Sequence, residues 1–221
     1  MFSIEQFKQQ YDVEQTTFSV GSHRLKLFIP QKIDAFINPD DLFSDFPLWS
    51  KIWEATAVLA SHMSTIQVNP AHRILEIGAG MGVAGLCSAR MGHRITITEY
   101  NEDALNFARA NALLNNMEPD IVTKLDWNTP LVQGRFDYII GSEVVFKETD
   151  FPGLYVLFQK YLKPGGRIIL AEGMRKTSLK FIQEMEKHFL IRMKKQTIGP
   201  PEKPVAVVLM ELKEKKKTRV D

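Results

Sequence analysis

The chain has 221 residues, 44% of them hydrophobic, which is enough to bury one substantial core, so we expect one domain with appendages. Its 28 basic and 26 acidic residues leave a net charge of +2, too small to indicate a nucleic-acid or membrane-surface partner. No apolar run approaches the ~20 residues of a membrane-spanning helix, and the N-terminus lacks the regions of a signal peptide, so we expect a cytoplasmic protein.

Residues 1–65 predict an N-terminal extension that packs on the main fold. It begins with the pattern of a short polar helix. Two alternating runs around Gly21 and Ser22 then predict a β-hairpin over residues 16–29, because alternation interrupted by turn residues is typical of paired strands. Residues 38–47 combine turn-forming and aromatic residues and predict a loop.

A tryptophan-containing helix is predicted over residues 48–63. Trp49, Trp53 and Val58 recur near helical spacing, as on the apolar face of a helix. Both tryptophans suit the role of core anchors. The alternative is that Trp53 covers the mouth of a ligand cavity.

Residues 66–212 alternate between strand and helix patterns, which predicts an α/β fold with a mostly parallel sheet and helices on both faces. The last two apolar runs, 190–196 and 205–212, should pair antiparallel because the loop between them is short. Residues 213–221 predict a solvated basic tail. We expect the other strands at 73–77, 94–98, 121–125, 136–140 and 167–171, and the helices at 83–91, 101–115, 151–161 and 177–189.

The stretch Arg-Ile-Leu-Glu-Ile-Gly-Ala-Gly-Met-Gly, residues 73–82, organises the rest of the chain. A short apolar run ends in a glycine series, and a helical pattern follows from Val83, so the order is strand, tight loop and helix N-terminus. Glycines let a ligand approach the backbone, and the first N–H groups of the helix face the same crevice. The stretch therefore predicts a cradle for a nucleotide or nucleoside.

The glycines alone leave two ligands open. Gly80, Gly82 and Gly85 have the spacing of the dinucleotide fingerprint, and Glu99 follows at about 20 residues, as in nicotinamide-binding proteins. Counted from Gly78, the first glycine after the strand, the third fingerprint position is a valine instead.

The acidic residue ahead of the loop helps to decide between these ligands. Glu76 stands two residues before Gly78, and a carboxylate there would repel a pyrophosphate and attract a cationic group. S-adenosylmethionine carries an ammonium and a sulfonium and has no phosphate. The sequence therefore favours S-adenosylmethionine.

Taken together, three segments resemble the class I S-adenosylmethionine-dependent methyltransferases. Residues 76–82 look like the first motif of that class, Glu99 looks like the acidic residue that grips the ribose hydroxyls, and residues 162–170 are similar to another recurring segment. The resemblance implies a Rossmann-like sheet of seven strands with the last antiparallel. It also implies cofactor contacts from Glu76, Gly78, Ala79, Gly80, Gly82 and Glu99, with Tyr100 flanking the adenine.

Within the class, the chain resembles methyltransferase family 16, which is rich in protein-lysine methyltransferases. The segments that carry this likeness are 53–55, 126–127 and 141–146. The likeness implies that Asp126 and Trp127 contact the adenine and that Ser142 lies at the inner wall of the site.

Glu143 and Phe146 occupy the place of the family's Asp-x-x-Tyr motif, with a longer carboxylate and without the tyrosine hydroxyl. Methyl transfer to an amine is an in-line displacement, so the protein must align and deprotonate the nucleophile and exclude water. Glu143 is our catalytic candidate because a carboxylate there would hold an ammonium or accept its proton. The alternative is a charged residue that caps the loop. Phe146 would wall the acceptor channel, and Arg175 and Lys176 are candidate substrate contacts.

The leading hypothesis is an enzyme that methylates a lysine side chain of a protein substrate. The alternatives are a small-molecule N- or O-methyltransferase, a non-catalytic binding module and, more remotely, a nicotinamide-dependent oxidoreductase. No metal site is expected, because the five histidines lack ligand spacing and Cys87, the only cysteine, suits a buried packing role. The oligomeric state stays open.

Overall fold

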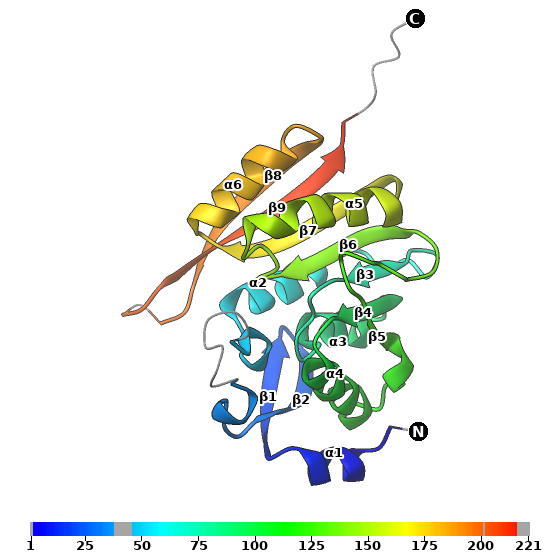
Figure 1. The fold of residues 1–221 in the computed structure, drawn as a ribbon, viewed down its shortest axis with the longest axis vertical. Coiled ribbons are helices and arrows are strands. Elements are labelled where there is room, and N and C mark those ends of the chain that lie inside the picture. The colour runs from blue at the N-terminus through cyan, green and yellow to red at the C-terminus, as the bar shows by residue number, and fades with distance from the viewer. Residues whose placement is uncertain (1, 38–45, 201, 216–221) are drawn as a thin grey trace, which may run out of the picture.

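The computed structural model describes residues 2–37, 46–200 and 202–215. Its centre is a seven-stranded sheet in the order β5-β4-β3-β6-β7-β9-β8 (Figure 1). The strands are β3 (Ile74–Glu76), β4 (Ile95–Glu99), β5 (Val122–Lys124), β6 (Phe136–Ser142), β7 (Leu162–Gly173), β8 (Phe189–Ile198) and β9 (Val205–Glu214).

The last strand, β9, inserts between β7 and β8 and runs antiparallel to both, whereas the pairs from β5 to β7 are parallel. The predicted sheet of seven strands with its last strand antiparallel is therefore confirmed. Every strand differs from its predicted range at one end or both, most of all β7, which begins at Leu162 instead of residue 167. β7 is longer at both ends, and β9 takes in Lys213 and Glu214 of the predicted basic tail, where Lys213 Nζ lies 3.8 Å from Glu211 Oε1.

Helices cover both faces of the sheet, as the alternation predicts. One apolar cluster joins α2 (Glu54–Met63), α3 (Val83–Arg90) and α4 (Glu102–Leu114) to one face of the sheet. A second joins α5 (Phe151–Tyr161) and α6 (Lys176–Met185) to the other. Cys87 lies buried in the first cluster, in agreement with its expected packing role.

The predicted helix over residues 48–63 is wrong in its first half. The chain forms the 3-10 turn η2 (Leu48–Ser50), extends at Lys51, and begins α2 only after Trp53. Trp53 Nε1 donates to the carbonyl of Leu48 at 2.9 Å, so the indole takes an acceptor that a continuous helix would need. This interruption turns both tryptophans toward the carboxyl edge of the sheet.

The N-terminal segment comprises α1 (Ile4–Gln10) and the predicted hairpin, formed by β1 (Val13–Val20) and β2 (His23–Pro30). Figure 1 shows it at the opposite end of the molecule from β8 and β9. The boundary at residue 65 stays a prediction, and residues 38–45 and 216–221 of the predicted loop and tail lie outside the described residues. Three short turns complete the chain, η1 (Asp34–Phe36), η3 (Pro119–Ile121) and η4 (Glu148–Asp150).

Two asparagines of α4 attach the hairpin to the main sheet. Asn111 exchanges hydrogen bonds with the backbone of Phe28, accepting from its N–H at 2.7 Å and donating to its carbonyl at 3.3 Å. Asn115, one helical turn later, does the same with Lys26 at 3.1 and 2.7 Å. Because an amide side chain both donates and accepts, the pair satisfies the free edge of β2 as a neighbouring strand would.

Candidate functional site

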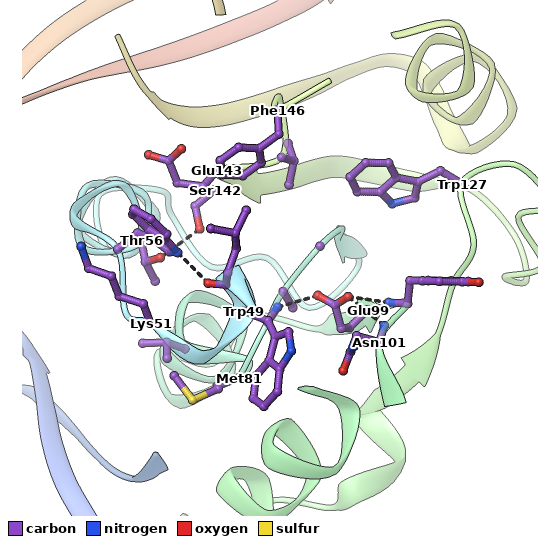
Figure 2. Close-up of a pocket in the computed structure, with 18 of the residues that line it drawn as sticks. Trp49, Lys51, Thr56, Met81, Glu99, Asn101, Trp127, Ser142, Glu143 and Phe146 are labelled. Atoms are coloured by element: carbon purple, nitrogen blue, oxygen red, sulfur yellow. Dashed lines mark hydrogen bonds between the residues drawn. The ribbon is translucent and has the colours of Figure 1, made fainter. Parts of the chain in front are cut away.

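A cavity of about 550 Å³ opens where β3, β4 and β6 end. Parallel strands of an open α/β sheet place their carboxyl ends at one edge, and the loops that follow them line this cavity (Figure 2). The segment of η2 and the start of α2 form the opposite side, with Trp49, Trp53 and Thr56 among the lining residues. Of the thirteen residues that the sequence predicts to be catalytic or to bind the cofactor, eleven line this cavity and two do not.

The glycine loop forms the floor of the cavity. Gly78 and Gly80 have φ angles of 56° and 54°, in the left-handed region that side chains disfavour. A Cβ at Gly78 would lie 2.9 Å from Val144 Cγ1 and 3.3 Å from the ring of Trp127, so no side chain fits there. The loop, with Ala79 between these glycines, therefore offers bare backbone to a ligand.

Glu99 ties the end of β4 to this loop. One carboxylate oxygen accepts from the N–H of Gly80 at 2.8 Å, and the other accepts from Tyr100 and Asn101 at 2.7 and 3.1 Å (Figure 2). A carboxylate has about four acceptor positions, so capacity is left for hydroxyl donors in the cavity. Tyr100 also lines the cavity, with 59% of its surface exposed.

Asp126 and Trp127 follow β5 and reach the same cavity. The Asp126 carboxylate accepts from the N–H of Asn128 at 2.8 Å and from the Thr129 hydroxyl at 3.3 Å, which fixes the turn that presents the tryptophan. Trp127 stands beside Gly78, so its ring supplies an apolar wall directly above the bare backbone. This is the arrangement that the resemblance implies for an adenine.

Glu76 lies beneath the loop instead of in the cavity, which differs from the expected ligand contact. It is 1% exposed, and one carboxyl oxygen has no partner. Burial raises the pKa of Glu76 to about 8, partly offset by the backbone N–H of Gly85. An enclosed carboxyl of this kind provides no direct counter-charge for a ligand's ammonium.

Gly82 is the second residue outside the cavity lining. It precedes the first residue of α3 with a φ of 80°, and a Cβ there would lie 3.1 Å from the Cβ of Ala108 on α4. Its small size serves the close packing of two helices. Sequence spacing alone does not separate a glycine required by a ligand from one required by packing.

The far end of the cavity is formed where β6 ends. Ser142 lines it and shares a hydrogen bond with Thr56 at 3.1 Å, which joins β6 to α2 (Figure 2). Glu143 follows with a φ of 54°, a left-handed conformation that is costly for a residue with a side chain. Phe146 completes this wall.

The carboxylate of Glu143 is already engaged by the protein. One oxygen accepts from the N–H of Gly173 at 2.9 Å, and the other forms an ion pair with Arg175. The Arg175 guanidinium carbon lies 4.4 Å from the centre of the Phe146 ring. These contacts are what the loop-capping alternative for Glu143 requires, and they show that Arg175 pairs within the protein. The substrate contact expected of Arg175 stays a prediction.

Several lining residues were not identified from the sequence, among them Trp49, Lys51, Met81 and Asn101. Trp49 was assigned to a helix face, and the turn at η2 brings its carbonyl to 3.2 Å from the Cβ position of Gly80. Lys51 Nζ lies 4.3 Å from the centre of the Trp53 ring. Asn101 caps α4 by accepting from the N–H of Ala104 at 3.0 Å, and an asparagine directly before a helical pattern is the sequence signal for such a cap.

Within the described ranges, no three His, Cys, Asp or Glu side chains gather as a metal-binding group. No helix of the described chain is both long and apolar enough to cross a membrane.

The fold and the position of the cavity define an S-adenosylmethionine-dependent class I methyltransferase architecture. Among solved structures, the ribosomal protein L11 methylase of Lactobacillus delbrueckii subsp. bulgaricus superposes with a TM-score of 0.63 at 19% identity, covering 90% of this chain and 98% of that one. At this identity the likeness concerns the fold.

The chain belongs to the lysine methyltransferase family, methyltransferase family 16, whose model matches residues 48–196. It is 29% identical over 153 residues to the protein N-lysine methyltransferase METTL21A of Danio rerio, covering 66% of each chain, just under two thirds of that relative's length. It is also 29% identical over 132 residues to the EEF1A lysine methyltransferase 3 of Mus musculus, covering 57% of this chain and 56% of that one. The resemblance to family 16 is therefore confirmed.

Proposed function

We propose that this protein transfers a methyl group from S-adenosylmethionine to the side-chain nitrogen of a lysine in another protein. The observation that carries the proposal is the family match over residues 48–196, which takes in every cavity-lining residue except Phe46. The names of the relatives in Danio rerio and Mus musculus support a lysine acceptor in a protein.

The donor end of the cavity suits the cofactor in three places. The backbone around Gly78 and Gly80 would accommodate its amino-acid part, Glu99 would accept from the ribose hydroxyls, and Trp127 would pack on the adenine. When bound, the cofactor supplies an electrophilic methyl on its sulfonium. The protein's part is to orient this ligand and to keep water from it.

The acceptor end is suited to a narrow side chain. Trp53, Ser142 and Phe146 surround it, and the aromatic rings would hold the alkyl stem of a lysine while excluding water. Glu143, although engaged with Arg175, still faces the cavity and would give the acceptor amine an acidic neighbour.

Calorimetric titration with S-adenosylhomocysteine tests the cofactor part. We expect binding by the wild type and its loss in Gly78→Ala, because a methyl group there would meet Val144 and Trp127. Gly165→Ala is the matched control, since Gly165 also has a positive φ, 77°, but no atom within 4 Å of its Cβ position. Absence of wild-type binding at millimolar ligand would contradict the proposal.

The acceptor is tested by incubating the protein with labelled cofactor and cell lysate. We expect a labelled protein band that releases methyl-lysine on acid hydrolysis. Label only in small molecules would indicate the small-molecule alternative, and cofactor binding without any transfer would indicate a binding module. The expected cytoplasmic location stays a prediction, which fractionation of cells expressing tagged protein checks.

A further inference from the structure

Two carboxylates and one guanidinium meet where β6 and β7 end, next to the cavity. We call Glu143, Glu172 and Arg175 the carboxylate cluster. Glu172 is 0% exposed, and the Glu143 side chain is 7% exposed. Arg175 pairs with both, lying 3.3 Å from Glu172 Oε2 while it contacts Glu143. Over the described ranges, neither carboxylate has another ion-pair partner.

Glu172 holds the loop that follows Glu143. Its two oxygens accept from the N–H groups of Val144 and Val145 at 2.9 and 3.4 Å. Glu143 itself is held from the other side by the N–H of Gly173. Residues 143–145 are therefore connected to β7 through buried carboxylates, and Arg175 joins those carboxylates to each other.

The burial of two acidic groups side by side requires a cation, because desolvation and mutual repulsion both disfavour their charged forms. Burial, followed by the charge of Glu143, raises the pKa of Glu172 to about 8, and Arg175 acts in the opposite direction. A guanidinium suits the position, since its Nη2 contacts an oxygen of each carboxylate while its planar face lies on the Phe146 ring. A lysine ammonium has no planar face to stack on this ring.

We propose that Arg175 is a positioning residue for the acceptor end of the cavity, whose guanidinium spans both carboxylates and thereby fixes Glu143 and Phe146 in place. This inference rests on the proposed function for its kinetic consequences. Glu143 has a left-handed backbone conformation, which persists only where its surroundings hold it. Its N–H donates to the carbonyl of Ala171 at 2.9 Å, and its side chain is held by the N–H of Gly173 and by the ion pair with Arg175.

The test compares Arg175→Gln and Arg175→Lys with Lys195→Gln, a charge-removing control at an exposed residue of β8 outside the cavity lining. The acceptor is the lysate protein fraction, and the rate of methyl incorporation is measured against pH. For Arg175→Gln we expect at least a tenfold lower rate at saturating cofactor, and S-adenosylhomocysteine affinity within threefold of wild type.

Arg175 lowers the pKa of Glu172, so loss of this cation should raise that pKa further and move the acid limb of the rate profile to higher pH. Arg175→Lys should give intermediate values, and Lys195→Gln should match the wild type. If Arg175→Lys had the same rate and pH profile as the wild type, a guanidinium would not be needed at this position. This comparison still tests the proposal if Arg175→Gln does not fold.

Hydrogen exchange provides a readout that needs no activity. The amides of Val144, Val145 and Gly173 should exchange faster in Arg175→Gln than in the control, because their acceptors lose their common partner. If the wild type transfers no methyl group, the proposed function fails, but the exchange rates of these amides still test the positioning role of Arg175. Unchanged exchange rates in Arg175→Gln would contradict that role.

Discussion

Trp127 is the side chain on which the donor end of the cavity most depends. Its ring lies against Gly78, whose backbone leaves no room for a Cβ, so ring and loop form one surface. Replacing Trp127 by Ala should weaken S-adenosylhomocysteine binding by about tenfold to a hundredfold, because stacking of a base on an aromatic ring contributes about 1–3 kcal/mol. Calorimetry measures the change.

Trp127→Phe is the matched variant for this prediction. It keeps an apolar ring beside Gly78 and should retain most of the affinity for S-adenosylhomocysteine. Both variants should unfold at similar temperatures if Trp127→Ala weakens binding through the lost contact with the ligand and not through a loss of stability. Equal affinity of Trp127→Ala and wild type would remove the adenine contact from the proposal.

At the scale of single residues, the sequence predicted which side chains lie in the cavity better than it predicted their partners. Glu99 and Trp127 follow strands, and strand ends meet at one edge, so their presence in the cavity was predictable. The burial of Glu76 was not, because it depends on how α3 packs over β3 at Gly85. The pairing of Glu143 with Arg175 joins residues 32 apart in the chain, which no local pattern indicates.

At the scale of elements, attachment of the hairpin depends on a short helical stripe. Asn111 and Asn115 are one turn apart on α4, and each exchanges two hydrogen bonds with the edge of β2. Asn111→Ala should lower the free energy of unfolding by about 1–3 kcal/mol, since it leaves the buried polar groups of Phe28 without partners. Denaturant unfolding measures this value.

Gln183→Ala on α6 is the control, because its side chain is exposed and alanine favours a helix. It should change the free energy of unfolding by no more than about 0.5 kcal/mol. Equal stability of Asn111→Ala and this control would mean that the bonds of Asn111 do not stabilise the attachment, and that the buried apolar side chains of β2, such as Leu27 and Phe28, carry it.

The elements themselves were largely predictable, because strand and helix periods alternate along residues 73–212 and each change of period marks a boundary. The exception, residues 48–53, has helical spacing and helix-forming residues. A single indole hydrogen bond to Leu48 overrides that preference. The sequence does not indicate this bond, because it forms only when Lys51 is extended and the Trp53 side chain folds back toward Leu48.

At the scale of the whole molecule, two buried carboxyls make stability depend on pH. Burial raises the pKa of Glu76 and that of Glu172 to about 8, against about 4.5 when the chain is unfolded. Between these values the native state holds protons that the unfolded state has released, so the free energy of unfolding falls as pH rises. It should therefore decline from about pH 5 to pH 8 and level off above.

Denaturant unfolding at several pH values checks this decline, which is at most about 1.4 kcal/mol per pH unit for each group. Glu76→Gln removes one titrating group while keeping its shape, so its curve should be flatter than that of wild type across this window. Glu14→Gln, at an exposed position on β1, should leave the slope unchanged. Equal slopes for the wild type and Glu76→Gln would show that Glu76 is ionised in the folded protein over this window, and would require a cationic partner for Glu76 that the described chain does not contain.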